Sequence, residues 1–268
     1  MPRLAIRKTY KLFIGGKFPR SESGRTQVVD GDNVALASRK DARDAVVAAR
    51  KAQPGWAGAT AYNRGQILYR AAEMLESRRD EFATLAVDQA ELDAAIDRLV
   101  WYAGWSDKLA QVTGGANPVS GPFFNISAPE PTGVVAVIAP ASLLGLVSVV
   151  APAIVTGNAV VVVSTGPQVA ITLAEVLATS DLPGGVVNIL TGRPAEIAPW
   201  LASHDDVNGI DLTAIDEPEL AADLERSAAG TLKRVRRPAG TPDFAADPGL
   251  RPMTAFLETK TVWHPKGF

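Results

Sequence analysis

The chain has 268 residues, with 27 lysines and arginines against 29 aspartates and glutamates, and a formal net charge of −2. This length allows one large domain or two modest ones, and the near-neutral charge argues against a nucleic-acid binder, which would carry a basic face. Hydrophobic residues make up 47% and charged residues 21% of the chain, which excludes a disordered protein. Cysteine is absent, which excludes disulfides, thiolate metal sites and a cysteine nucleophile.

No segment is predicted to cross a membrane. The most apolar stretch, Gly133–Val163, is interrupted by Pro140, Pro152 and Gly157, whereas a spanning helix needs about 20 continuous apolar residues. The opening residues MPRLAIRKTYKLF lack the long apolar core of a secretory signal. We therefore expect a cytoplasmic protein without membrane contact.

The first 122 residues predict extended segments followed by three helices. Gly15-Gly16 between two short apolar runs is typical of a tight hairpin. Asp41 is expected to be the N-cap of a helix that Pro54 and Gly55 end. The expected elements are a hairpin over 10–18, extended chain over 26–37, helices starting at 41 and near 61, a third helix over 92–111 and a loop over 114–122.

From residue 123 the pattern changes to short apolar runs that alternate with helical segments. Gly133–Pro140 is continuously apolar, as expected of a strand covered on both faces. Strands that alternate with helices predict βαβ units and a parallel sheet, hence an α/β fold. The predicted strands are 133–140, 159–165, 185–192 and 207–213, and the predicted helices are 142–157, 169–180, 195–204 and 218–229.

The last forty residues carry a basic run, a linker and an alternating tail. Four basic residues occur between Lys233 and Arg237. A solvated strand or loop edge is the favoured interpretation, and a basic patch for an acidic partner is the alternative. Thr241–Gly249 reads as a linker, and the tail reads as a strand. Its predicted faces are Phe256, Glu258, Lys260 and Val262 on one side, and Leu257, Thr259, Thr261 and Trp263 on the other.

The polar residues form no recognisable catalytic or metal set. His204 and His264 have no second ligand at metal spacing, so we interpret them as surface or capping residues. The carboxylates interpreted as solvated loop charges, rather than as an acid–base pair, are Asp211, Asp216 and Glu217. The serines that lack the G-x-S-x-G context of a hydrolase nucleophile are Ser142 and Ser164.

In their order along the chain, several segments resemble the NAD(P)-dependent aldehyde dehydrogenases. The matching pieces are KLFIGGKF with RSESGRT, WAGATAYNRGQILYRAAEMLESRRDEF, YAGWSDK, PTGVVAVIAP, APAIVTGNAVVVV, LPGGVVNILTG and ETKTVWHP. The resemblance implies a Rossmann-like coenzyme domain with an N-terminal helical segment and oligomerisation strands. The domains expected from it are an N-terminal hairpin and helical segment over 1–122, a Rossmann-like segment over 123–240, a linker over 241–249 and an oligomerisation strand over 250–268.

The resemblance also implies what is missing. In the family a catalytic domain with the cysteine nucleophile lies between the coenzyme domain and the last strand, and here Thr241–Gly249 stands in its place. Oxidation by the family route needs a thiolate nucleophile and a glutamate base. The alignment puts Pro238 at the glutamate position and Ser142 at that of the oxyanion-hole asparagine. We expect a catalytically inactive chain.

The coenzyme positions implied by the resemblance are altered as well. The family's KPSE lysine and glutamate, which hold the adenosine ribose, correspond to Val163 and Gly166. The FTGS turn near the pyrophosphate corresponds to a segment with Thr213 and Ala214, and the carboxylates of Asp216-Glu217 follow. Carboxylates there repel a phosphate that a helix N-terminus would attract. We therefore expect no cofactor, with NAD binding lost.

The tail predicts a partner. In the family this strand pairs with the catalytic-domain sheet of a neighbouring subunit, which this chain does not retain, and an exposed strand edge aggregates unless something covers it. A full-length aldehyde dehydrogenase paralogue is the expected partner in a hetero-oligomer. The expected contacts are Phe256, Glu258, Lys260, Val262 and Trp263. The alternatives are an NAD-dependent oxidoreductase acting on aldehydes and a self-associating remnant.

Overall fold

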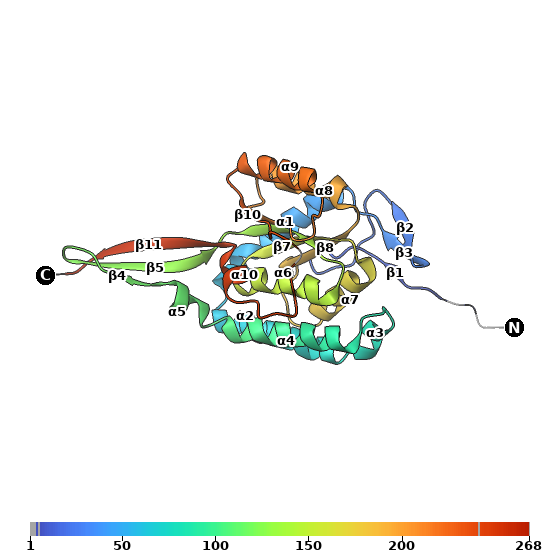
Figure 1. Ribbon diagram of the computed structural model, residues 1–268, viewed down its shortest axis with the longest axis horizontal. Coiled ribbons are helices and arrows are strands. Elements are labelled where there is room, and N and C mark those ends of the chain that lie inside the picture. The colour runs from blue at the N-terminus through green and yellow to red at the C-terminus, as the bar shows by residue number, and fades with distance from the viewer. Residues whose placement is uncertain (1–3, 5, 241, 268) are drawn as a thin grey trace.

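The structure is a computed structural model that describes residues 4, 6–240 and 242–267. These residues form a body around a central sheet and a long arm that projects from it (Figure 1). The helices described are α1 Arg39–Gly58, α2 Ala61–Glu76, α3 Arg79–Ala83, α4 Gln89–Trp105, α5 Leu109–Thr113, α6 Leu143–Val155, α7 Pro167–Ala178, α8 Pro194–Ser203, α9 Pro218–Ala229 and α10 Arg251–Thr254. The strands described are β1 Thr9–Tyr10, β2 Thr26–Val29, β3 Asp32–Ala35, β4 Gly115–Asn117, β5 Phe123–Pro131, β6 Val134–Ala139, β7 Ala159–Ser164, β8 Val187–Thr191, β9 Gly209–Asp211, β10 Arg234–Arg236 and β11 Leu257–Pro265.

The central sheet has the strand order β10-β9-β6-β7-β8, and every neighbouring pair is parallel. The chain runs from β6 outward through β7 to β8, and then returns to the other side of β6 for β9 and β10. Every residue of β6, β7 and β8 is buried, because helices cover both faces of the sheet. The expected α/β, Rossmann-like fold is confirmed.

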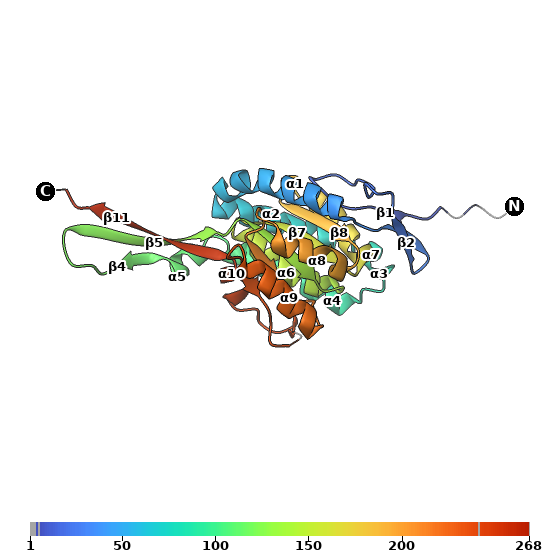
Figure 2. The same cartoon turned by 90° about the horizontal axis from the view of Figure 1, so that it is seen from above.

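The two faces of the sheet are covered by different sets of helices (Figure 2). One core contains apolar residues of α1, α8 and α9, and the other contains residues of α2, α4, α6 and α7. Successive side chains of a strand point to opposite faces, so Val162 belongs to the second core and Val163 to the first. Helix α6 is buried over its whole length. No helix among the described residues is long and apolar enough to span a membrane.

Helix α1 differs from its prediction at both ends. Its N-cap is Ser38 instead of Asp41, and Asp41 completes a capping box as the third helical residue. The helix also continues past Pro54 to Gly58. Trp56 explains this continuation, because its side chain is buried and its indole N–H donates to the carbonyl of Ile154 at 2.7 Å. Tertiary packing therefore outweighs the helix-breaking tendency of proline.

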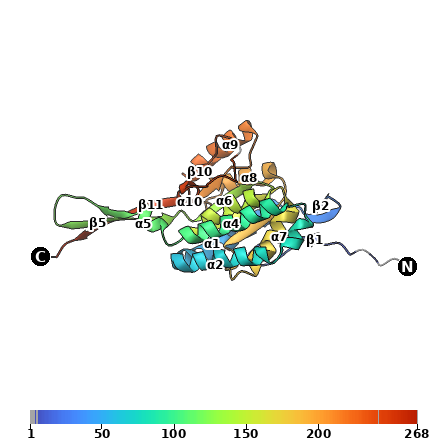
Figure 3. The ribbon, with the colours of Figure 1, turned by 60° about the horizontal axis from the view of Figure 1, so that its bottom comes forward.

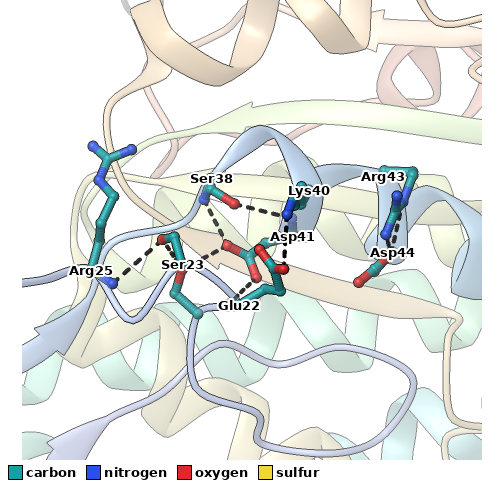
Figure 4. A network of polar contacts seen from close by, with 9 residues as sticks. Glu22, Ser23, Arg25, Ser38, Lys40, Asp41, Arg43 and Asp44 are labelled. Atoms are coloured by element: carbon teal, nitrogen blue, oxygen red, sulfur yellow. Dashed lines mark hydrogen bonds and ion pairs between the residues drawn. The ribbon is translucent and has the colours of Figure 1, made fainter.

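Asp41 also ties the preceding segment to the start of α1 (Figure 4). The side chain is buried, and its carboxylate accepts hydrogen bonds from Ser38 N at 2.7 Å, Glu22 N at 2.9 Å and Ser21 Oγ at 2.8 Å. Bonds to a buried charged acceptor are stronger than bonds between neutral groups. This one carboxylate thus holds two segments together.

Replacing Asp41 by alanine is expected to lower the free energy of unfolding by about 3 kcal/mol, because it leaves buried donors without an acceptor. The matched control is Asp44→Ala, which removes a half-exposed carboxylate paired with the adjacent Arg43 and should cost less than about 1 kcal/mol. Urea unfolding of both variants measures the difference. Equal losses would contradict this role of Asp41.

Two further predictions for the helical part need correction. The helix expected over 92–111 is divided into α4 and α5, with a break at residues 106–108. The segment 114–122, expected to be a loop, contains the short strand β4. The other N-terminal expectations agree more closely: Gly15 and Gly16 form a turn with Ile14 bridged to Lys17, and β2 and β3 are antiparallel around Gly31.

The tail strand is paired within this chain, so the expectation of an unpaired strand is wrong. The arm is an antiparallel sheet of order β11-β5-β4, in which β11 pairs with β5 from Leu257↔Pro131 to Pro265↔Phe123. Residues 123–131, which the sequence analysis assigns to the Rossmann-like segment, therefore belong to the arm and not to the parallel sheet. The sequence pattern missed β5 because it contains Pro129 and Pro131, which normally exclude a central strand. They are tolerated because β4 covers only residues 125–127 of β5.

Candidate functional site

The carboxyl edge of the central sheet is the place where this architecture binds ligands. The strand order reverses between β6 and β9, and open α/β sheets bind ligands in the crevice outside the strand ends at such a point. The turn after β6 contains Ser142, the turn after β7 contains Gly166, and the turn after β9 contains Thr213 and Ala214. The structure therefore gathers at one edge four of the positions singled out in the sequence.

Ser142 is engaged in a structural role. It is the N-cap of α6, and its Oγ accepts a hydrogen bond from Gly145 N at 3.2 Å. Serine is a favoured residue at this position because it satisfies one of the free N–H groups of the first helical turn. The hydroxyl therefore serves the start of α6.

Val163 and Gly166 present no polar side chain to the crevice. Val163 is fully buried and packs in the core beneath α1 and α8. Gly166 lies against the turn after β6, where a Cβ on residue 166 would lie 2.9 Å from Ala141 Cα and still closer to the Ala141 carbonyl oxygen. Real Cβ atoms do not approach backbone this closely, so the position accepts no larger residue without a backbone shift.

The backbone N–H groups of the turn after β9 are used inside the chain. Thr213 N donates to Asp211 Oδ1 at 2.9 Å, and Ala214 N donates to the Ile138 carbonyl at 3.2 Å. A phosphate-binding turn needs N–H groups that are free to point at the ligand. Asp216 and Glu217 follow on the surface at the start of α9.

Asp211 is buried, so its interpretation as a solvated loop charge is wrong. Its Oδ2 accepts from Arg236 Nη1 at 2.6 Å, and Thr213 bonds to Oδ1. The side chain of Asp211 is 1% exposed and that of Arg236 is 21% exposed. The reason is the pairing of β10 with β9, which lays Arg236 directly beside Asp211 in register. The ion pair ties β10 to β9 at this end of the sheet.

The basic run of residues 233–237 forms the edge strand β10 and its surroundings, as the favoured interpretation expects, but it is solvated only in part, because Arg234 and Arg237 are exposed whereas Lys233 is buried. Lys233 is buried, and this burial lowers the pKa of its ammonium group. The three arginines bond to different carboxylates: Arg234 to Glu258 of β11, Arg236 to Asp211 of β9 and Arg237 to Glu225 of α9. The run therefore does not act as a single patch.

The two histidines lie far from each other in different elements. His204 Nδ1 accepts from Asp206 N at 3.1 Å, and its ring packs edge-on against Trp200. His264 lies on the arm opposite Phe124. No group of three or more potential metal ligands occurs in the part of the chain that the structure describes.

The arm is the second candidate site, because it exposes apolar side chains on both faces. The exposed residues are Phe123, Phe124, Ile126, Val262 and Trp263. The rings of Phe123 and Trp263 meet edge-to-face with centroids 5.8 Å apart, and Trp263 is 56% exposed. Isolated exposed apolar residues are common, but a cluster of this kind typically marks an interaction surface.

Other residues of the tail hold the arm to the rest of this chain. Phe256, expected as an exposed contact, is buried at the root of the arm, and its carbonyl accepts from Thr132 N at 3.1 Å and Asn158 Nδ2 at 3.0 Å. Glu258 forms a bidentate pair with Arg234 of β10. Lys260 pairs with Glu130 of β5 at 2.9 Å. These contacts fix the base of the arm and leave its outer half exposed.

Comparison with known proteins places these sites in context. The model of the aldehyde dehydrogenase family matches residues 26–241. The chain is 34% identical over 250 residues to "Aldehyde dehydrogenase, cytosolic 1" of Elephantulus edwardii, covering 84% of this chain and 49% of that protein. It is 31% identical over 240 residues to the "Cytosolic 10-formyltetrahydrofolate dehydrogenase" of Mus musculus, covering 80% of this chain and 26% of that protein.

A solved structure shows the same relationship. The crystal structure of HpcC from Thermus thermophilus superposes with a TM-score of 0.77 at 28% identity, covering 85% of this chain and 47% of that one. The chain thus spans about half the length, or less, of the relatives it matches.

Proposed function

This chain belongs to the aldehyde dehydrogenase family, and we propose that it is a non-catalytic subunit that assembles with a full-length member of that family. The family consists of NAD(P)-dependent oxidoreductases. The observations that carry the proposal are a sequence that contains no cysteine and a carboxyl edge whose Asp211–Arg236 ion pair and turn N–H groups are engaged within the chain. The chain retains the scaffold of the family and directs the exposed outer half of its arm to a partner.

The catalytic half of the proposal rests on the residues at the family's reactive positions. Aldehyde oxidation by the family route begins with attack of a thiolate on the carbonyl carbon, and no residue of this chain supplies one. Pro238 has no group that accepts a proton, and the hydroxyl of Ser142 caps α6. Neither the nucleophile, the base nor the oxyanion donor is therefore provided by these positions.

The coenzyme positions support the same proposal, because they do not fit a dinucleotide. Val163 is buried, and Gly166 contacts the Ala141 backbone at the place where a ribose-binding side chain would begin. The N–H groups of Thr213 and Ala214 already have acceptors within the chain. A bound dinucleotide would lose several hydrogen bonds at once.

The assembly half of the proposal rests on the arm. The outer edge of β11 has no strand partner among the described residues, and β4 covers only a short part of β5. Such edges pair with other chains by strand addition unless they are covered. The exposed aromatic pair of Phe123 and Trp263 provides an anchor of the kind that dominates protein interfaces.

Calorimetric titration of the purified chain with NAD and with NADP tests the coenzyme claim. We expect no saturable binding up to about 1 mM, because each lost hydrogen bond costs about 1 kcal/mol and about 1.4 kcal/mol is tenfold in affinity. A full-length family member, purified and titrated in the same way, is the control and should bind. Micromolar binding by this chain would contradict the proposal.

A further inference from the structure

A pocket of about 680 Å³ is lined by residues from the carboxyl end of β10, the linker that follows it and α10. Figure 3 shows β10 and α10 close to the base of the arm. This size is typical of small-molecule sites. Three arginines line it, namely Arg236, Arg237 and Arg251. We propose that this pocket binds a small organic phosphate monoester. None of Val163, Gly166, Thr213 and Ala214 lines it, although Arg236 bonds to Thr213. The proposal does not rest on the proposed function.

The charge of the pocket favours an anion. Arg236 bonds to Asp211 and Thr213 through Nη1 only, and Arg237 bonds to Glu225 through Nη1 at 3.2 Å. A guanidinium has five N–H donors, so both arginines keep donors for a ligand. The side chain of Arg251 is exposed and makes no hydrogen bond or ion pair to the part of the chain that the structure describes.

The lining therefore contains three guanidinium groups, of which two pair with carboxylates outside the lining, Asp211 and Glu225, and it has an excess positive charge. A phosphate monoester carries up to two negative charges and three terminal oxygens. Guanidinium groups recognise such oxygens through paired N–H donors, and arginine is the residue best suited to this geometry. A singly charged carboxylate would satisfy fewer of the available donors.

The rest of the lining indicates an organic group attached to the phosphate. Pro238, Pro242, Pro248 and Pro252 contribute rigid apolar walls, and Val235 adds a further apolar side chain. Small-molecule sites commonly combine such apolar surface with a few placed polar groups. The pocket is also far larger than an inorganic phosphate ion, so a ligand that fills it must carry additional atoms.

Calorimetric titration of the whole chain with phenyl phosphate tests the proposal. We expect saturable binding, and we expect Arg251→Ala and Arg237→Ala each to weaken it about tenfold or more, the effect of losing a charge-assisted contact. The matched control is Arg226→Ala, since Arg226 is an exposed arginine of α9 that pairs with Asp223 outside the pocket. That variant should bind as the original chain does.

Two competing ligands decide the chemical class. Benzoate and benzyl alcohol have a similar ring, but benzoate carries one negative charge and benzyl alcohol carries none. Both should bind more weakly than phenyl phosphate. Equal binding of benzoate would overturn the assignment of a phosphate. No saturable binding of phenyl phosphate, or binding unchanged in Arg251→Ala, would overturn the site itself. If Arg251→Ala fails to fold by circular dichroism, Arg251→Lys takes its place, because it keeps the charge but loses the paired donors.

Discussion

Replacing Phe256 by alanine is expected to lower the free energy of unfolding by about 3–5 kcal/mol, the cost of removing a large buried aromatic side chain. Phe256 is 2% exposed, and its ring fills the space beside Gly209, where a Cβ would lie 2.7 Å from the ring. The residue joins the core of the body to the first residue of β11. The loss should therefore appear both in overall stability and in the attachment of the arm.

Urea unfolding measures the first effect, and amide hydrogen exchange in β5 and β11 measures the second. Phe124→Ala is the matched control, because Phe124 lies in the arm but is 58% exposed. It should change the free energy of unfolding by less than about 1 kcal/mol. If the two variants lose equal stability, the buried ring of Phe256 does not anchor the arm to the body.

The second large effect concerns the partner. Replacing Trp263 by alanine is expected to weaken binding to the full-length family member about 30-fold or more, because a central interface tryptophan typically contributes about 2 kcal/mol or more. Tyr62→Ala is the control, since Tyr62 is an aromatic residue that is 64% exposed on α2, outside the three strands of the arm. Surface plasmon resonance with the full-length protein immobilised gives both affinities. Equal weakening by the two substitutions would contradict an interface on the arm.

A point substitution is a better test here than deletion of the tail. Deleting residues 254–268 would remove the buried Phe256 and leave β5 without its partner along nine residues. If such a truncated chain failed to assemble, the cause could be either unfolding or the missing interface, and the experiment would not distinguish them. Trp263 is exposed and lies on the outer half of the arm, so we expect its replacement to leave the fold intact.

The sequence was sufficient to predict the central sheet because its strands are buried on both faces. The runs Val134–Ala139 and Ala159–Val163 are continuously apolar, and the helices between the strands have clear boundaries. In this part of the chain, local pattern and tertiary environment agree. Right-handed crossovers restrict how these strands connect, but the return of the chain to the other side of β6 for β9 is seen only in the structure.

The arm could not be predicted in the same way. Its main contact joins β5 to β11 across more than 120 residues of sequence, and neither the two prolines of β5 nor its polar residues suggest a strand. The tail strand itself was recognised from its alternation. Its partner within the chain was not, because a strand pattern shows which residues alternate but not which strand they meet.

The candidate site shows a similar limit. Ser142, Val163 and Gly166 stand out only through a family resemblance, and the structure adds what each does in the fold: Ser142 caps α6, Val163 is buried in the core, and Gly166 lies against the backbone of Ala141. The buried pair of Asp211 and Arg236 was missed, because it depends on the pairing of β9 with β10. An aspartate that ends an apolar strand, followed later by a basic strand, was the available signal.

Light scattering coupled to size-exclusion chromatography, on this chain mixed with the full-length family member from the same organism, tests the central claim most directly. We predict one species that contains both chains and is larger than either protein alone, and we predict that Trp263→Ala shifts it back towards the separate components. The opposite result is also clear. If this chain elutes on its own at every concentration while the full-length protein remains unbound, it is not a subunit of such an assembly.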